Sequence, residues 1–212
     1  MSGAGVDPGT EPDPGSVTGL GAILLVGGRA RRMDGAVKPL LSVGGAPLLT
    51  RALRALAHAG ADPVVAVGPR LDESDVVWVR EDPPFGGPVA AIAAALAHGA
   101  LAATEWVLVL AGDLVHPEAV VRRLLAAPRT AEYDGVVFRA GEQPQWLAAL
   151  YRVGSLRAAL AELDAPEGVP CRALLGGLAL HRILDEDGCT GDIDTPEDLD
   201  RARADAQMEE IS

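Results

Sequence analysis

The chain has 212 residues, a hydrophobic fraction of 49% and a formal net charge of -12 at pH 7. That length suits one domain with a sizeable core, which the 3% aromatic content leaves mainly to Ala, Val and Leu. The acidic balance excludes a nucleic-acid-coating surface, and no apolar stretch comes close to spanning a bilayer. We expect a soluble, cytoplasmic protein with no nucleic-acid or membrane partner.

The ends of the chain differ in composition from its middle. Residues 1–19 are rich in Gly, Pro and acidic side chains, which predicts a disordered tail, and they lack the basic start and apolar stretch of a signal peptide. We expect one domain over 20–204 and a short C-terminal tail over 205–212. Cys171 and Cys189 are too few for a disulfide framework and lack metal-ligand spacing, so we expect inert thiols in a reducing compartment.

Short apolar runs alternate with Ala- and Leu-rich stretches along the domain. The apolar runs predict strands at 21–26, 63–68, 76–79, 106–112, 134–138 and 178–184. Helical spacing predicts helices at 47–60, 88–101, 118–127, 155–163 and 195–207. Residues 146–151 suit a strand or a helix equally well.

This alternation indicates an α/β fold: a single three-layer α/β/α domain with a mostly parallel sheet covered on both faces. In such folds the ligand binds outside the carboxyl ends of the strands. We therefore expect the functional site in the loops that follow residues 26, 80, 112 and 184.

The loop after the first strand, LLVGGRARRMDGAVK (24–38), combines Gly27 and Gly28 with three arginines and Lys38, the only lysine in the chain. Glycines bring backbone N–H groups close to a ligand, and guanidinium and ammonium groups suit phosphate oxygens. The absence of a Gly-Lys-Ser/Thr ending excludes a Walker-type loop, and the absence of a third glycine excludes a dinucleotide fingerprint. From its residues alone, the loop is either an anion-binding loop or a strand–loop with surface arginines.

Five segments, in order, resemble the signature of the molybdenum cofactor guanylyltransferase family. They are LLVGGRARRMDGAVKPLLSVGGAPLL, REDPPFGGPVAAI, VLVLAGDLVHP, GEQPQWLAALYR and GDIDTPEDL, and the resemblance covers residues 20 to about 204. It implies a nucleotidyltransferase with a glycosyltransferase-A-like, Rossmann-related fold, similar to the nucleotide-diphospho-sugar transferases. The implied reaction is Mg²⁺-dependent transfer of GMP from GTP to the phosphate of the molybdopterin cofactor, with release of pyrophosphate. Gly27 favours guanylyl transfer, because cytidylyl and uridylyl relatives tend to have alanine there.

The resemblance also implies roles for individual residues. The nucleotide would lie against Leu25, Val26, Gly27, Gly28, Gly87 and Pro88. Arg32 and Lys38 would face the triphosphate, and Asp82 would contact the nucleoside. Asp113 would hold Mg²⁺, while Asp192 and Asp194 stand where the family has a late polar pair, which makes Asp194 a second candidate ligand. A molybdoenzyme or another cofactor-biosynthesis protein would receive the product.

Several of these residues have a structural alternative. Asp113 could cap the helix that starts near Pro117, and Asp82 could be a loop carboxylate in a Pro-rich turn. Asp194 could be the cap of the last helix rather than a ligand. Trp146 suits either a flat pterin in an acceptor pocket or the core.

Four positions depart from the family pattern: Asp34 replaces glycine, Val37 a common aspartate, Val26 an alanine and Val115 a proline. Asp34 places a carboxylate in a loop meant for phosphates and should weaken nucleotide binding unless Arg32 or a neighbouring arginine neutralises it. The departures keep two alternatives open. One is a related transferase that uses CTP or another phosphorylated acceptor, and the other is a non-catalytic nucleotide- or cofactor-binding relative.

Overall fold

The computed structural model describes residues 19–27, 37–71 and 74–211. The strands are β1 (Leu20–Leu25), β2 (Ser42–Val43), β3 (Ala46–Pro47), β4 (Val64–Val67), β5 (Val77–Val79), β6 (Trp106–Ala111), β7 (Gly135–Ala140), β8 (Gln143–Arg152) and β9 (Leu180–Leu184). The helices are the 3-10 turn η1 (Lys38–Leu40), α1 (Leu48–His58), α2 (Pro88–Ala97), α3 (Pro117–Ala126), α4 (Val153–Ala161), α5 (Cys171–Leu175) and α6 (Pro196–Ile211).

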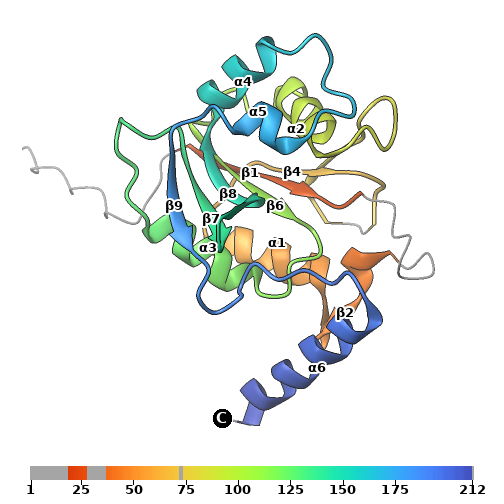
Figure 1. Cartoon of the computed structure of the whole chain (residues 1–212). Helices are drawn as coiled ribbons and strands as arrows, with labels where there is room; N and C mark the ends of the chain where they lie inside the picture. The colour runs from red at the N-terminus through yellow and green to blue at the C-terminus, as the bar shows by residue number, and fades with distance from the viewer. Residues whose placement is uncertain (1–18, 28–36, 72–73, 212) are drawn as a thin grey trace, which may run out of the picture.

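Seven strands form one central sheet in the order β5-β4-β1-β6-β8-β7-β9 (Figure 1). Strands β5, β4, β1 and β6 are parallel, as are β7 and β9, whereas β8 runs antiparallel to both β6 and β7. The prediction of an α/β domain with a mostly parallel, covered sheet is confirmed. The segment 146–151, which suited either a strand or a helix, is part of β8.

The central strands of the sheet bury side chains on both of their faces. In β1, Ala22 and Leu24 join one core cluster and Ile23 joins the other. The alternation follows from the two-residue repeat of a strand. Helices α1 and α3 cover the first face, and α2, α4 and α5 cover the second (Figure 1). Burial on both faces explains why the strands have continuous apolar sequences rather than alternating ones.

Three short elements were not predicted from the sequence. Helix α5 and the hairpin of β2 and β3 are too short to show a hydrophobic period, and η1 is a single turn. Gly44 and Gly45 make the hairpin turn, with φ of 57° and 72°, a backbone region that glycine adopts without a steric penalty. Helix α6 also continues to Ile211, beyond the end at 207 that the sequence indicated.

Glycines allow the carboxyl ends of the central strands to approach closely. A Cβ on Gly112, after β6, would lie 2.9 Å from the carbonyl oxygen of Leu25, and one on Gly68, after β4, would lie 2.8 Å from the Gly27 nitrogen. The Gly112 N–H donates to Leu25 O over 2.8 Å, so pairing between the chains continues past the strands. Any larger residue would separate the loops that follow these strands.

A third, smaller core cluster attaches the C-terminal segment to the domain. Ile193 is fully buried in it, together with Leu199 and Ala202 of α6 and with Val43 and Leu48. In an extended segment, neighbouring side chains point in opposite directions, so burying Ile193 turns Asp192 and Asp194 away from this cluster.

None of the described helices is both long and apolar enough to cross a membrane.

The buried Ile193 side chain should therefore contribute strongly to stability. We expect Ile193→Ala to lower the free energy of unfolding by about 2–5 kcal/mol and Ile193→Val by about 0.5–1.5 kcal/mol, because the smaller side chains leave a cavity. Leu184→Ala, at a position on β9 that is 38% exposed, is the control and should cost less than about 1 kcal/mol. Urea denaturation of the three variants measures these values, and equal losses for Ile193→Ala and Leu184→Ala would contradict the assignment.

Candidate functional site

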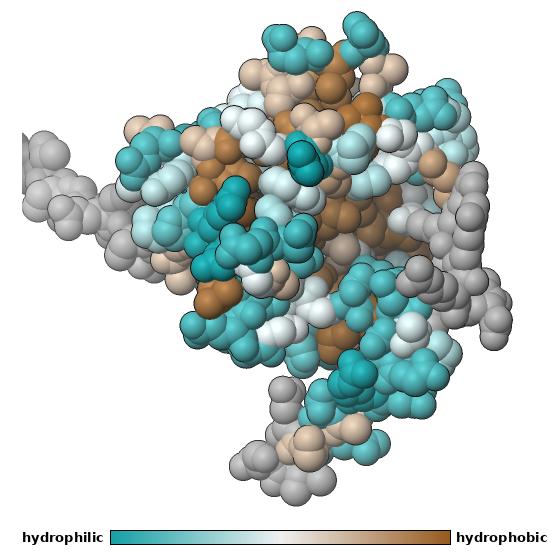
Figure 2. Space-filling model, in the orientation of Figure 1, coloured by the Kyte–Doolittle hydropathy of each residue, from teal (hydrophilic) through white to brown (hydrophobic). Residues whose placement is uncertain are grey.

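A cavity of about 700 Å³ lies at the carboxyl ends of β1, β4, β5 and β6. Its walls come from the ends of these strands, from η1, from the start of α2, from β8 and from the segment that precedes α6. Figure 2 shows this face of the molecule hollowed, with hydrophobic residues inside the depression. The position agrees with the general rule for open α/β sheets, in which ligands bind beyond the carboxyl ends of the strands.

Most of the residues expected at the site line this cavity. They are Leu25, Val26, Gly27, Lys38, Gly87, Pro88 and Asp113. Asp82 is exposed and is not among the lining residues, while Asp194 reaches the site through a contact with Lys38. Gly28 and Arg32 lie outside the described residues.

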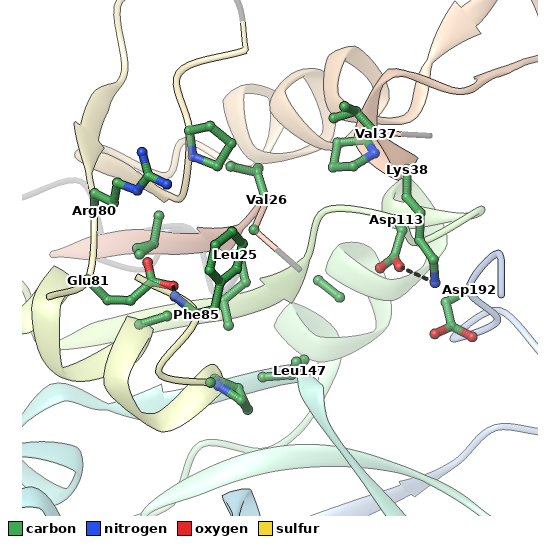
Figure 3. Close-up of a pocket in the computed structure, with 18 residues that line it drawn as sticks. Leu25, Val26, Val37, Lys38, Arg80, Glu81, Phe85, Asp113, Leu147 and Asp192 are labelled. Carbon is green, nitrogen blue, oxygen red and sulfur yellow. Dashed lines mark hydrogen bonds and ion pairs between the residues drawn. The ribbon is translucent and has the colours of Figure 1, made fainter. Parts of the chain in front are cut away.

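Lys38 is held by two carboxylates at one end of the cavity. Its Nζ donates to Asp113 Oδ2 over 3.3 Å and to Asp194 Oδ1 over 2.5 Å. The Lys38 and Asp113 side chains are 18% and 20% exposed, and that of Asp194 is 52% exposed. Figure 3 shows Lys38 and Asp113 facing each other, with Asp192 beside them. The three chain segments that carry Lys38, Asp113 and Asp194 therefore meet at one ammonium group.

The charges of this cluster perturb one another. Burial alone would lower the pKa of Lys38, but the hydrogen bond to Asp194 and the charges of Asp113 and Asp194 outweigh it and raise that pKa. Partial desolvation raises the pKa of Asp192, and repulsion from Asp113 and Asp194 raises it further. The site thus concentrates more negative charge than one lysine neutralises.

Backbone pairing brings the distant aspartates together. Leu114, just after Asp113, forms an antiparallel bridge with Asp192, and the Val115 N–H donates to Gly191 O over 3.0 Å. Two segments almost eighty residues apart in the sequence are thereby joined beyond the end of β6. The pairing fixes where the carboxylates of Asp113, Asp192 and Asp194 can lie.

Asp113 and Asp194 do not cap the helices that begin near them. At α6, the Asp198 N–H donates to Thr195 Oγ1 over 3.2 Å, while Asp198 Oδ2 accepts from the Thr195 N–H over 2.9 Å. This reciprocal arrangement is a capping box, so Thr195 is the cap and the Asp194 carboxylate is left to pair with Lys38. At α3, the N-cap position is His116 rather than Asp113.

Among the described residues that depart from the family pattern, some line the cavity and one does not. Val26 is buried and lines the cavity, and Val37 lines it while remaining 44% exposed. Val115 is buried in the third core cluster, where its apolar side chain packs with Ile193 and Leu199. Asp34 lies outside the described residues. Of the departures that can be placed, Val37 is the one that puts an apolar side chain in the cavity where the family pattern has a charged one, and Lys38 and Asp113 remain there.

Arg80, Glu81 and Phe85 are among the cavity residues that reasoning from the sequence missed. They lie at the end of the cavity opposite Lys38, Asp113 and Asp192 (Figure 3). The segment R-E-D-P-P-F carries two adjacent carboxylates, and the family pattern drew attention to the second. The chain bends directly after Glu81, so only the course of the backbone shows which of the two carboxylates enters the cavity.

A smaller cavity of about 250 Å³ adjoins the main one and shares Ala111, Leu147 and Asp192 with it. Trp146 lines this second space together with Gln145. Trp146 is partly buried and packs against the second core cluster, and it also lines this space.

A second cluster of acidic residues has a structural role. Asp185, Asp187 and Cys189 offer ligand atoms within 4.8 Å of one another. However, Arg123 Nη1 donates to Asp187 over 2.6 Å, and Asp185 accepts from the backbone N–H groups of Cys189 and Thr190. Burial, reinforced by Asp185, raises the pKa of the Cys189 thiol to about 12, so it stays protonated. The cluster fixes the turn after β9, and its ligand positions are already in use.

The Lys38 cluster, by contrast, has the chemistry of a divalent-cation site. Asp113, Asp192 and Asp194 offer carboxylate oxygens, which Mg²⁺ prefers, and a cationic group already lies between two of them. Burial is the main cause of the raised pKa of Asp192, and repulsion from Asp113 and Asp194 adds to it; a cation bound there would offset this repulsion. These residues therefore fit Mg²⁺ in donor type and in charge.

Comparison with known proteins places the chain among the nucleotidyltransferases. A family model described as the MobA-like NTP transferase domain matches residues 22–183. A nucleotidyl transferase structure from Methanothermobacter superposes with a TM-score of 0.72 at 20% identity, covering 91% of this chain and 100% of that one. This similarity establishes the fold.

Two curated relatives are similar in sequence over most of their length. A probable molybdenum cofactor guanylyltransferase from Opitutus terrae is 35% identical over 68% of this chain and 72% of the relative. A molybdenum cofactor guanylyltransferase from Nitrobacter hamburgensis is 34% identical over 67% of this chain and 73% of the relative. Fold and cavity together define a nucleotidyltransferase. The chain belongs to the MobA-like NTP transferase family, among the molybdenum cofactor guanylyltransferases, which confirms the resemblance seen in its sequence motifs.

The position of Lys38 predicts opposite effects of its removal on two ligands. Lys38→Met should tighten Mn²⁺ binding in the absence of nucleotide by about 10-fold, because the ammonium group no longer competes for Asp113 and Asp194. The same variant should bind magnesium nucleotide more weakly, because a charge for the phosphates is lost. Calorimetry with each ligand measures both effects. Unchanged or weaker Mn²⁺ binding by a folded Lys38→Met variant would contradict this account.

Proposed function

We propose that the protein transfers GMP from GTP to the phosphate of the molybdopterin cofactor and releases pyrophosphate. The observation that supports this proposal most is a cavity with one charged end and one end suited to a base. Lys38 and the aspartates lie at the first end, and Arg80, Glu81 and Phe85 lie at the second. A nucleoside triphosphate has the same polarity, with its phosphates at one end and its base at the other.

The reaction exchanges one phosphorus–oxygen bond for another. An oxygen of the acceptor phosphate attacks the α-phosphorus of GTP, and the bond from that phosphorus to the bridging oxygen of the β-phosphate breaks. Pyrophosphate leaves with the bonding electrons, so no oxidant or reductant is needed. The protein has to hold two anions that repel each other in line and stabilise the charge that develops.

Residues of the charged end suit this task. Lys38 is released from Asp113 and Asp194 when phosphates enter, and its ammonium group then binds their oxygens as a compact charge. Asp113 and Asp194 would hold Mg²⁺, with Asp192 close enough to contribute. When bound, Mg²⁺ offsets the negative charge of the phosphates and orients them.

The adjoining cavity suits the acceptor. Trp146 offers a flat apolar face for a pterin ring, and the shared wall at Asp192 puts this space next to the charged end of the main cavity. The acceptor phosphate would therefore enter the charged end from the side opposite the base.

Both cysteines are free, which agrees with a reaction in the reducing cytoplasm. A molybdoenzyme or another cofactor-biosynthesis protein would take the product there.

A nucleotide panel tests this function. Each of the four NTPs is supplied with Mg²⁺ and the molybdopterin cofactor, and the release of pyrophosphate is measured. We expect turnover with GTP and little with the other three. Turnover of CTP in preference to GTP would contradict the guanylyl assignment, and nucleotide binding without any turnover would indicate a non-catalytic relative.

Asp113→Asn tests the charged end in the same assay. Loss of this carboxylate should lower kcat by about 100-fold or more, since it removes a group that acts on the reacting phosphates. Asp187→Asn is the matched control, because its side chain is 64% exposed and belongs to the turn after β9. Equal activities of the two variants would show that Asp113 has no part in the reaction.

A further inference from the structure

Glu81 is a buried carboxylate with no cationic partner among the residues that the structure describes. Glu81 is 9% exposed. The Asp185 side chain is also buried, at 3% exposed, but it has Arg123 within 3.9 Å and accepts hydrogen bonds from Cys189 and Thr190. No ion pair joins Glu81 to any residue that the structure describes, although burying an unpaired carboxylate is costly. A buried carboxylate that no described residue pairs with, on the wall of a cavity, suits a ligand that supplies the partner.

The carboxylate of Glu81 is fixed in orientation. The Phe85 N–H donates to Glu81 Oε1 over 3.0 Å, four residues along the same loop. No hydrogen bond from a described residue reaches Oε2, although Glu81 lines the cavity. The group is therefore held in place with acceptor capacity directed at the ligand space.

The partner of this carboxylate must be a hydrogen-bond donor, and a carboxylate accepts two parallel N–H bonds best. Guanine offers two such donors side by side, N1–H and the N2 amino group. In adenine and in cytosine the amino group lies next to a ring nitrogen that accepts, and the single N–H of uracil lies between two carbonyl oxygens. Guanine is thus the one common base whose edge matches Glu81 with two bonds.

The neighbouring residues fit the rest of a guanine ring. Arg80 also lines the cavity, and its guanidinium donors suit the O6 and N7 acceptors of guanine. The Phe85 ring lines the same end of the cavity and is 52% exposed, and an aromatic side chain suits contact with a base. Acceptor, donor and aromatic face are therefore present together at the end of the cavity away from the phosphates (Figure 3).

We propose that Glu81 selects guanine by accepting hydrogen bonds from its N1–H and N2 amino groups, with Arg80 and Phe85 supporting the ring. The adjacent Asp82, to which the family pattern pointed, is exposed and is not among the residues that line the cavity. This inference rests on the proposed function, because it explains how that site chooses its nucleotide.

Nucleotide binding without acceptor tests the inference. Calorimetry compares GTP with ITP, which lacks only the N2 amino group, for the wild-type protein and for Glu81→Gln. Wild-type protein should bind ITP about 10-fold more weakly than GTP, since one hydrogen bond to a charged group is lost. Glu81→Gln should bind GTP about 10- to 100-fold more weakly, and its GTP/ITP ratio should fall close to one, because the amide nitrogen opposes the donors of the base.

Two further variants keep the test specific. Glu142→Gln changes a side chain that is 90% exposed and should leave both affinities as in the wild type. Arg80→Met should weaken GTP and ITP alike, because both bases carry O6 and N7.

Three results would overturn the inference: equal binding of GTP and ITP by the wild-type protein, an unchanged GTP/ITP ratio in folded Glu81→Gln, or loss of the ratio in Asp82→Asn instead. The first needs no variant, so it stands even where Glu81→Gln fails to fold. Any of them, combined with GTP turnover in the nucleotide panel, would reject the role of Glu81 and leave the proposed function intact. Turnover of CTP instead of GTP would reject both.

Discussion

The ion pairs of Lys38 with Asp113 and Asp194 are the interaction on which the site depends. They connect the start of η1, the end of the buried strand β6 and the segment before α6. Without them, the negative charge of the aspartates would be partly buried and unbalanced, which is unfavourable. The same charges make the position attractive to a divalent cation and make the lysine available to phosphates. One arrangement therefore stabilises the free protein and prepares it for its ligands.

Backbone pairing and apolar packing in other parts of the fold hold the ion pairs of Lys38 in position. The bridge between Leu114 and Asp192 and the burial of Ile193 align the late aspartates with the end of β6. The glycines after β4 and β6 let the strand ends approach closely enough to form one floor for the cavity. A capping box at Thr195 and Asp198 completes the start of α6 and leaves the Asp194 carboxylate for Lys38. The charged end of the cavity is thus built by backbone pairing and apolar burial rather than by the charges alone.

Strands such as β1 and β6 could be predicted from the sequence because burial on both faces gives them continuous apolar runs. The position of Gly27 and Lys38 at the cavity could be predicted, because they follow a predicted buried strand and ligands bind beyond the carboxyl ends of such strands. The choice between Glu81 and Asp82 could not be predicted, since it depends on which way an extended loop turns. Nor could the pairing of Leu114 with Asp192, because no local pattern records a contact between segments so far apart. The antiparallel direction of β8 could not be predicted either, because its apolar composition suits either a strand or a helix.

The central claim is that phosphates and cation meet at Lys38, Asp113 and Asp194 while the base lies at Glu81. The most direct measurement is a crystal structure with a non-hydrolysable GTP analogue and Mn²⁺, in which anomalous scattering locates the metal. The account predicts the Mn²⁺ peak within ligand distance of Asp113, Lys38 turned from the aspartates to the phosphates, and the guanine edge at Glu81. Mn²⁺ bound away from Asp113, or a nucleotide lying in the reverse direction with its base beside Lys38, would contradict it.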